Sequence, residues 1–245
     1  MPRNFVWPAD ALTHPGWTFG VDVSHHNGPV VWSMLQRQGV GFAYLKATQG
    51  TLFFDRSFAA HWRTLSELGG EKPILKGAYH FLSADVDAEL QAEHFLRIVN
   101  AAGGLHAGDL PPCLDVEWDP RTINGAEIDA WDKYSAQQIV ERIETWLRVV
   151  EKATGRRPIV YTNAIWWLSK TASSRALVDY PLWIADYAIE DLRNDEPRSL
   201  PGYRSPIWQF TDSGVMSEGG AIGRLDVSVF KGGRDDLVRT FAIRP

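Results

Sequence analysis

Leu114-Asp115-Val116-Glu117-Trp118 places two carboxyl groups two residues apart inside an apolar stretch of the chain. On a β-strand, residues i and i+2 point to the same face, so Asp115 and Glu117 project together, with Cα atoms roughly 6–7 Å apart. The three apolar residues then face the other way. A strand that carries two acids so close together on one face indicates a chemical role for them.

The residues before this pair indicate where the two acids lie. Leu110-Pro111-Pro112-Cys113 is apolar and stiff, which is typical of an approach to an interior strand. Unpaired acids are rarely fully buried, so we expect the pair at the end of a buried strand, opening into a cleft. Cleavage of a glycosidic bond uses two carboxyl groups around one scissile bond, and this pair favours that chemistry. A solvated face of an edge strand is the alternative.

Length and composition limit the class of protein. The chain has 245 residues, 44% of them hydrophobic and 22% charged, which is enough for one large domain of the size of an α/β barrel. The net charge is −5 and no basic block occurs, so nucleic acid is not expected as a partner. A single cysteine, Cys113, excludes an intrachain disulfide and a zinc finger.

Targeting and assembly give only weak patterns. No apolar run approaches the ~18–20 residues of a membrane span, and the first residues lack the apolar core of a signal peptide. We therefore expect a monomer that needs no membrane, metal or cofactor. The 11 tryptophans are an unusual number, and their rings suit either sugar binding or an aromatic core.

Strand-like and helical patterns alternate along the chain. Strand-like runs occupy residues 19–23, 41–48, 73–81, 112–118, 158–162, 182–187, 205–211 and 224–230. Helical patterns occupy residues 30–38, 55–68, 84–102 and 135–154. This order predicts an α/β fold with a mostly parallel sheet, and about eight strands predict a TIM-like barrel whose last third is irregular. Without a linker or repeat, we expect one domain over 1–245, with the barrel at about 19–232.

Two further acids occupy the first and last predicted strands. Asp22 lies between Val21 and Val23, and Asp226 lies between Leu225 and Val227. The first and eighth strands of a closed barrel are neighbours, and catalytic groups in such barrels lie at one end of the strands. The barrel therefore predicts that Asp22 and Asp226 converge with the acid pair. Taken singly, each is also compatible with a turn or cap.

Eight ordered motifs carry a resemblance to a known family. They are Gly20-Val21-Asp22-Val23-Ser24-His25-His26-Asn27-Gly28, Tyr44-Leu45-Lys46-Ala47-Thr48-Gln49-Gly50, Gly77-Ala78-Tyr79-His80-Phe81, Pro112-Cys113-Leu114-Asp115-Val116-Glu117, Pro158-Ile159-Val160-Tyr161-Thr162, Leu182-Trp183-Ile184-Ala185, Trp208-Gln209-Phe210-Thr211 and Gly223-Arg224-Leu225-Asp226. In this order and spacing the chain resembles the glycoside hydrolase family 25 muramidases, the Chalaropsis-type lysozymes.

The resemblance implies a fold, a substrate and a set of roles. The fold is an irregular barrel of five β/α units followed by three strands. The substrate is the peptidoglycan of the bacterial cell wall, cut outside the cytoplasm at the β-1,4 bond between N-acetylmuramic acid and N-acetylglucosamine. Glu117 matches the general acid, Asp115 matches the acid that steers or stabilises the 2-acetamido group, and Asp22 and Asp226 match two acids lining the site.

Other residues are candidates for contacts with the sugar. Tyr79, Tyr161, Trp183 and Trp208 lie in strand-end motifs and are expected to line the subsites, although each is also compatible with the core. Asp186 is either a fifth acid of the cleft or a surface residue.

Several positions depart from the family pattern or invite another interpretation. Gln49 stands where the family often has Glu, and Ser228 where Asn is common. Lys46 is expected to point inward as the partner of a cleft acid. His25-His26 suggests a metal site only weakly, because no His-x-x-x-His spacing or cysteine partner accompanies it.

Two other functions remain as alternatives. A chitinase-like family 18 enzyme also has D-x-E on its fourth strand, but its longer D-x-x-D-x-D-x-E pattern is broken here by Leu110 and Cys113. A non-catalytic glycan-binding barrel is disfavoured, because clustered buried acids cost stability and a binder would gain by losing them. The spacing alone leaves retention through the acetamido group and inversion by water both open.

Overall fold

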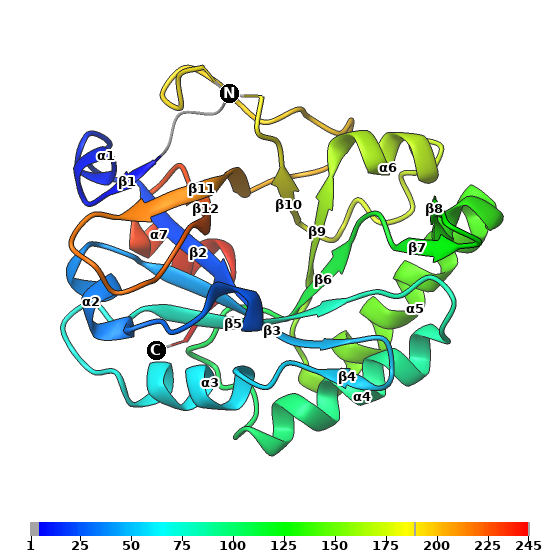
Figure 1. The fold of residues 1–245 in the computed structure, drawn as a ribbon, viewed down its shortest axis with the longest axis horizontal. Coiled ribbons are helices and arrows are strands. Elements are labelled where there is room, and N and C mark those ends of the chain that lie inside the picture. Colours follow the sequence, from blue (N-terminus) through cyan, green and yellow to red (C-terminus); the bar gives the residue numbers. More distant parts are fainter. Residues whose placement is uncertain (1–4, 189, 245) are drawn as a thin grey trace.

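The computed structural model describes residues 5–188 and 190–244, and its centre is a closed barrel of eight strands (Figure 1). The barrel strands are β2 (Thr18–Val23), β3 (Phe42–Gln49), β5 (Leu75–Phe81), β6 (Cys113–Val116), β9 (Ile159–Asn163), β10 (Leu182–Ala185), β11 (Ile207–Met216) and β12 (Leu225–Phe230). Neighbours from β2 to β11 are parallel, and β12 closes the barrel by pairing antiparallel with both β11 and β2.

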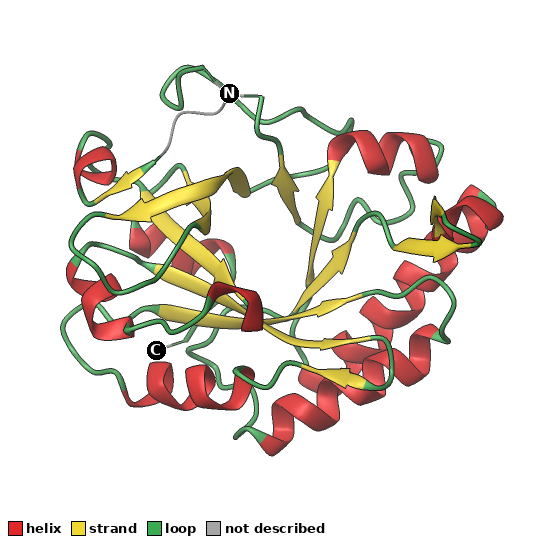
Figure 2. Ribbon diagram, viewed as in Figure 1, coloured by secondary structure: helices red, strands yellow, loops and turns green. Residues whose placement is uncertain are grey.

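Each of the first five barrel strands is followed by a helix. These helices are α2 (Trp32–Arg37), α3 (Phe58–Glu67), α4 (Ala88–Ala101), α5 (Ala136–Thr154) and α6 (Ala164–Lys170). The connections after β10 and β11 contain no helix among the described residues (Figure 2). The predicted barrel of five β/α units and three further strands is therefore confirmed.

Several smaller elements were not predicted. They are β1 (Val6–Trp7), α1 (Ala9–Leu12), η1 (His25–Asn27), β4 (Phe53–Phe54), the hairpin β7 (Pro120–Ile123) and β8 (Ala126–Asp129), η2 (Ala130–Lys133), α6 and α7 (Arg234–Thr240). Strand β1 extends the sheet by pairing in parallel with the far end of β11. None of the helices in the described ranges is long and apolar enough to cross a membrane.

The longest helix shows how local sequence sets the outer layer. Ser135 caps α5 by accepting the N–H of Gln138, whose side chain accepts the N–H of Ser135 in return, and Gly155 ends the helix at φ 65°. Its apolar face packs toward the barrel, where the Trp146 ring lies 5.2 Å from that of Phe95 on α4. Helices α4 and α5 thus lie side by side against one flank of the barrel (Figure 1).

The barrel interior is filled by side chains that need glycine opposite them. Gly77 on β5 faces the buried ring of Tyr44, whose hydroxyl donates to the carbonyl of Pro111 at 3.1 Å. A Cβ at residue 77 would lie 2.3 Å from Cε1 of that ring. The glycine of the G-A-Y-H-F motif therefore makes room for a large aromatic group at the centre of the barrel.

We expect Gly77→Ala to lower the free energy of unfolding by roughly 1–3 kcal/mol, because the ring of Tyr44 must move or the strands must separate. Urea unfolding followed by circular dichroism measures this. The matched control is Gly69→Ala, since no atom lies within 4 Å of the added methyl group at that position. Equal unfolding midpoints for the two variants would contradict this account of the interior.

Candidate active site

The structure brings the four predicted acids together in one pocket. Asp22 and Asp226 are direct cross-strand partners on β2 and β12, Asp115 lies on β6, and Glu117 follows the end of β6. All four line a pocket of about 280 Å³ at the carboxyl ends of the parallel strands. This is the end of a barrel at which catalytic groups are found.

Strand alternation on β6 explains why this pocket is acidic. Cys113 and Asp115 point into the barrel, whereas Leu114 and Val116 belong to the apolar layer outside it. Asp115 is only 7% exposed, and its Oδ1 has no hydrogen-bond partner among the described residues. A buried carboxyl group without such partners is costly when ionised, so the site favours its protonated form.

Both members of the D-x-E pair hold protons unusually tightly. Burial raises the pKa of Glu117 to about 7, opposed by the nearby charge of Lys46 and assisted by that of Asp226. Burial and the charge of Glu117 raise the pKa of Asp115 well above its usual value, again opposed by Lys46. The pair therefore retains a proton near neutral pH, as a general acid requires.

The second acid pair behaves in the same way. Burial and the charge of Asp226 raise the pKa of Asp22 well above its usual value, while a hydrogen bond from Gln209 lowers it. Burial raises the pKa of Asp226 to about 6, with Asp22 opposing and Asp212 adding to the shift. Two carboxyl groups in contact share protons as a unit, so this pair carries less than two negative charges near neutrality.

Three of the four predicted aromatic residues line the pocket, namely Tyr79, Tyr161 and Trp183. The Trp183 ring packs against Tyr161, with 4.8 Å between ring centroids, and its indole N–H donates to Ser228 Oγ at 2.9 Å. Ser228, the departure from the family pattern, is thus the acceptor that fixes the indole at this position.

Trp208 and Asp186 do not line this pocket, unlike the other predicted sugar contacts. On β11 the inward residue is Gln209, so Trp208 points outward, where it packs with Phe210 and donates its indole N–H to the carbonyl of Asp186. The Asp186 carboxylate accepts the backbone N–H groups of Ala188 and Arg198 at 3.2 and 2.8 Å. It organises the segment after β10 instead of adding a fifth acid.

Gln209 and Tyr187 reach the pocket although no role was predicted for either. A glutamine between two aromatic residues in W-Q-F is the pattern that indicates an inward polar group, because its neighbours face the outer apolar layer. Tyr187 lies just beyond β10, and only the fold shows that it turns back over the pocket.

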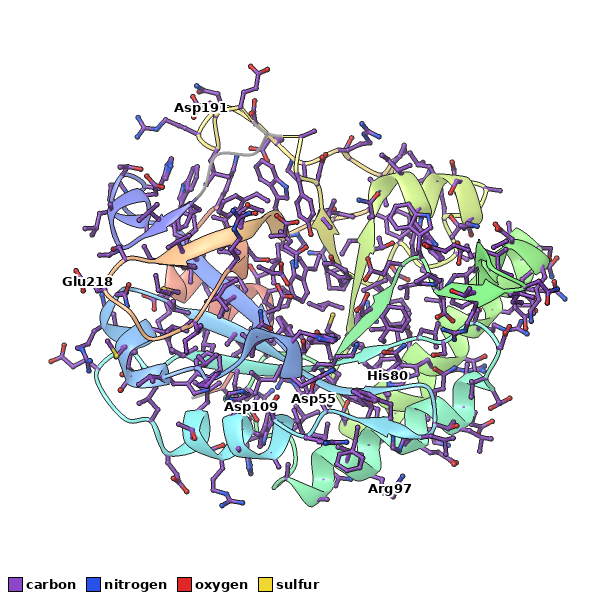
Figure 3. The ribbon with its side chains drawn as sticks, viewed as in Figure 1. Asp55, His80, Arg97, Asp109, Asp191 and Glu218 are labelled. Carbon is purple, nitrogen blue, oxygen red and sulfur yellow. The ribbon has the colours of Figure 1, made fainter. Side chains whose placement is uncertain are left out.

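The remaining polar residues of the motifs have structural partners. His25 donates its backbone N–H to Asp55, and its Nδ1 lies 2.8 Å from the same carboxylate oxygen; Asp55 is labelled in Figure 3. Lys46 points into the pocket and lies beside the acids, as predicted. Its ammonium group donates to Gln49 Oε1 at 3.0 Å, and among the described residues it has no ion pair with a carboxylate. No group of three potential metal ligands occurs in the described part of the chain.

A larger hollow of about 660 Å³ lies at the opposite end of the barrel. Its lining includes Arg156, Arg157, Arg204 and Arg244, and no aspartate or glutamate among the residues that the structure describes. Without a carboxyl group it cannot perform acid-assisted cleavage, so the acidic pocket is the candidate active site.

Comparison with known proteins identifies the family of the chain. Residues 21–219 match the family described as Glycosyl hydrolases family 25. The N,O-diacetylmuramidase of Chalaropsis sp is 32% identical over 203 residues, covering 79% of this chain and 88% of that protein. Uncharacterized protein YegX of Escherichia coli K12 is 32% identical over 223 residues, covering 89% and 71%. The bacterial lysozyme from Streptomyces coelicolor has a similar structure, with a TM-score of 0.78 at 29% identity over 91% of this chain and 96% of that one. The chain therefore belongs to glycosyl hydrolases family 25, and it is a glycoside hydrolase.

Proposed function

We propose that this enzyme is an N-acetylmuramidase, which cleaves the β-1,4 bond between N-acetylmuramic acid and N-acetylglucosamine in bacterial peptidoglycan. The observation that carries the proposal is the convergence of Asp22, Asp115, Glu117 and Asp226 in one pocket at the carboxyl end of the barrel. The enzyme acts as a monomer on the cell wall, outside the cytoplasm, with neither metal nor cofactor.

Glu117 is the general acid in this proposal. Its side chain is less buried than that of Asp115, and its pKa of about 7 leaves a proton available at neutral pH. It gives this proton to the glycosidic oxygen as the bond to the anomeric carbon breaks. Transfer of the proton makes the leaving group a neutral hydroxyl.

Asp115 acts on the positive charge that develops at the same time. In the free pocket burial favours its protonated form, so the substrate has to induce the ionised form that this role requires. A positive charge beside a carboxylate stabilises the ionised form, and the developing oxazolinium ion supplies that charge. Asp115 thereby orients the 2-acetamido group, whose carbonyl oxygen bonds to the anomeric carbon and closes the oxazolinium ring. A water molecule then attacks the anomeric carbon, the bond from that carbon to the acetamido oxygen breaks, and the Glu117 carboxylate accepts the proton of the water.

Digestion of purified peptidoglycan tests the reaction and the bond. Released sugars are reduced with borohydride and identified by mass spectrometry, with chitin digested in parallel. New muramic acid reducing ends are the expected result. New glucosamine ends, or release from chitin alone, would overturn the proposed bond, and no release from either polymer would overturn the proposed activity.

Gln49→Glu should extend activity to higher pH. The new carboxylate would pair with Lys46 and offset the positive charge that holds the pKa of Glu117 down. The pKa of Glu117 would then rise, and the alkaline limb of the pH–rate profile should move upward by roughly 0.5–1 pH unit. Gln137→Glu, on the exposed side of α5, makes the same charge change away from the pocket and should leave the profile in place. An unmoved alkaline limb in Gln49→Glu would show that Lys46 does not influence the acid.

A further inference from the structure

Gln209 connects four parts of the pocket through its side-chain amide. It is 2% exposed on β11, and its Oε1 lies 2.8 Å from the hydroxyl of Tyr161 on β9 and 2.5 Å from that of Tyr187 after β10. Its Nε2 lies 2.8 Å from Oδ2 of Asp22 on β2. A side chain that only filled space would not need three polar partners on three other segments.

The two tyrosines fix which way the amide points. Both hydroxyls donate to Oε1, which has two lone pairs. The two hydroxyls also contact each other, but only one of them can donate to the other, so at least one hydroxyl proton depends on Oε1. If the amide were turned round, both hydroxyl protons would lose this acceptor. The amide N–H therefore points at Asp22, which must accept it.

This contact restricts where the proton of the acid pair can lie. An oxygen that accepts an N–H bond at 2.8 Å cannot carry a proton along the same line, so Oδ2 of Asp22 is kept unprotonated. Asp226 is the cross-strand partner of Asp22. The proton that the pair retains is thereby left on the side where the two carboxyl groups face each other.

Lys46 and His26 line the same pocket, but among the described residues neither has a hydrogen bond or ion pair to Asp22 or Asp226. The titratable groups that influence Asp22 and Asp226, or are influenced by them, are Asp115, Glu117, Tyr79, Tyr161, Tyr187, Cys113 and Asp212. Each of these groups is neutral when protonated and negatively charged when deprotonated. The Gln209 amide is thus the polar donor that offsets negative charge on Asp22.

We propose that Gln209 is a positioning residue, which Tyr161 and Tyr187 hold so that its amide N–H keeps Asp22 a hydrogen-bond acceptor and confines the shared proton of Asp22 and Asp226 to their common edge. The inference rests on the proposed function, because it assigns the acid pair a fixed charge state beside the substrate. Tyr187 also ties the segment after β10 to this arrangement.

Carbon-13 NMR titration of the aspartate carboxyl groups tests the inference without substrate. Signals that disappear in Asp22→Asn and Asp226→Asn identify the pair. Gln209→Met keeps the volume of the side chain but removes the N–H, so the pair should titrate at a pH higher by roughly one unit. The double variant Tyr161→Phe/Tyr187→Phe frees the amide to turn round and should shift the titration in the same direction although Gln209 is present.

Gln91→Met is the matched control. Gln91 is also a fully buried glutamine, but it bonds to His80 and to the backbone of Ser83 and Val86 on the far side of the barrel wall. It should lower the melting temperature and leave the titration of the pair unchanged. A shift of the pair in Gln91→Met as large as in Gln209→Met, or no shift in Gln209→Met, would overturn the inference.

The pH–rate profile separates this inference from the proposed function. On peptidoglycan the acidic limb for Gln209→Met should move to higher pH, because the pair then gains its charge at higher pH. Absence of muramic acid ends with the unmodified enzyme would remove the proposed function, while the NMR shift would still decide the role of Gln209. Muramic acid ends without an NMR shift would leave the function in place and remove the inference.

Discussion

Replacing Glu117 by glutamine is expected to lower kcat on peptidoglycan by roughly 10²–10⁴-fold, because the amide keeps the shape of the side chain and has no acidic proton. Turnover is measured from the release of reducing ends, and binding from equilibrium dialysis with a soluble glycan fragment. The fold should be retained, since Glu117 is only partly buried and the amide adds no volume. Binding should therefore change far less than kcat.

The pH dependence of Glu117→Gln is the sharper part of this prediction. In the unmodified enzyme, activity should fall as pH rises through about 7, where Glu117 loses its proton. Residual activity of the variant should lack this alkaline limb. Glu127→Gln on the exposed strand β8 is the matched control and should retain the full rate and profile. Near-native turnover by Glu117→Gln would remove Glu117 from the role of general acid.

The barrel was predictable because its strands carry strong patterns. In β2 and β6 a polar residue alternates with apolar ones, and the same alternation that predicted the strands also pointed Asp22 and Asp115 inward. The hairpin of β7 and β8 was missed although Asn124-Gly125 marks its turn, with positive φ at both residues. Its strands are mostly exposed, so no apolar periodicity accompanied the turn.

The site was predictable only as far as each strand could be interpreted by itself. Trp208 was placed in the pocket because its motif lies at a strand end, but one step of alternation gives that position to Gln209. Asp186 and Tyr187 are adjacent in the chain. The charged Asp186 bonds to backbone N–H groups outside the pocket, whereas the uncharged Tyr187 lines the pocket. Which of two neighbours turns into a pocket depends on backbone hydrogen bonds made by residues 12 positions away, such as Arg198 N–H to Asp186. That information is absent from the local sequence.

Asp115→Asn is expected to abolish most activity and at the same time to stabilise the protein. Loss of the charge that faces the developing oxazolinium ion should lower kcat by roughly 10²–10³-fold. Among the residues that the structure describes, Oδ1 of Asp115 is buried without a hydrogen-bond partner, so the neutral amide removes the cost of ionising the carboxyl group. The gain should be roughly 1–2 kcal/mol, or roughly 2–8 °C in melting temperature.

The sign of the pH dependence distinguishes this stabilisation from a general effect of removing a carboxylate. The pKa of Asp115 is raised in the folded protein, so the unfolded chain releases its proton first as pH rises, and native Asp115 costs stability above about pH 4. The melting temperature of Asp115→Asn should therefore exceed that of the unmodified protein by more at pH 7.5 than at pH 4.

Asp55 provides the opposite case on the same fold. Burial alone would raise its pKa, but hydrogen bonds from Ser57 and His25 outweigh burial and hold the pKa below its usual value. Asp55 thus contributes stability above the unfolded pKa and loses it as pH falls, so Asp55→Asn should destabilise the protein most at pH 7.5. If Asp115→Asn lowered the melting temperature as Asp55→Asn does, the cost assigned to Asp115 would not exist. If they diverge, Asp115 is a residue whose presence lowers stability, and such a residue is retained for its chemistry and not for the fold.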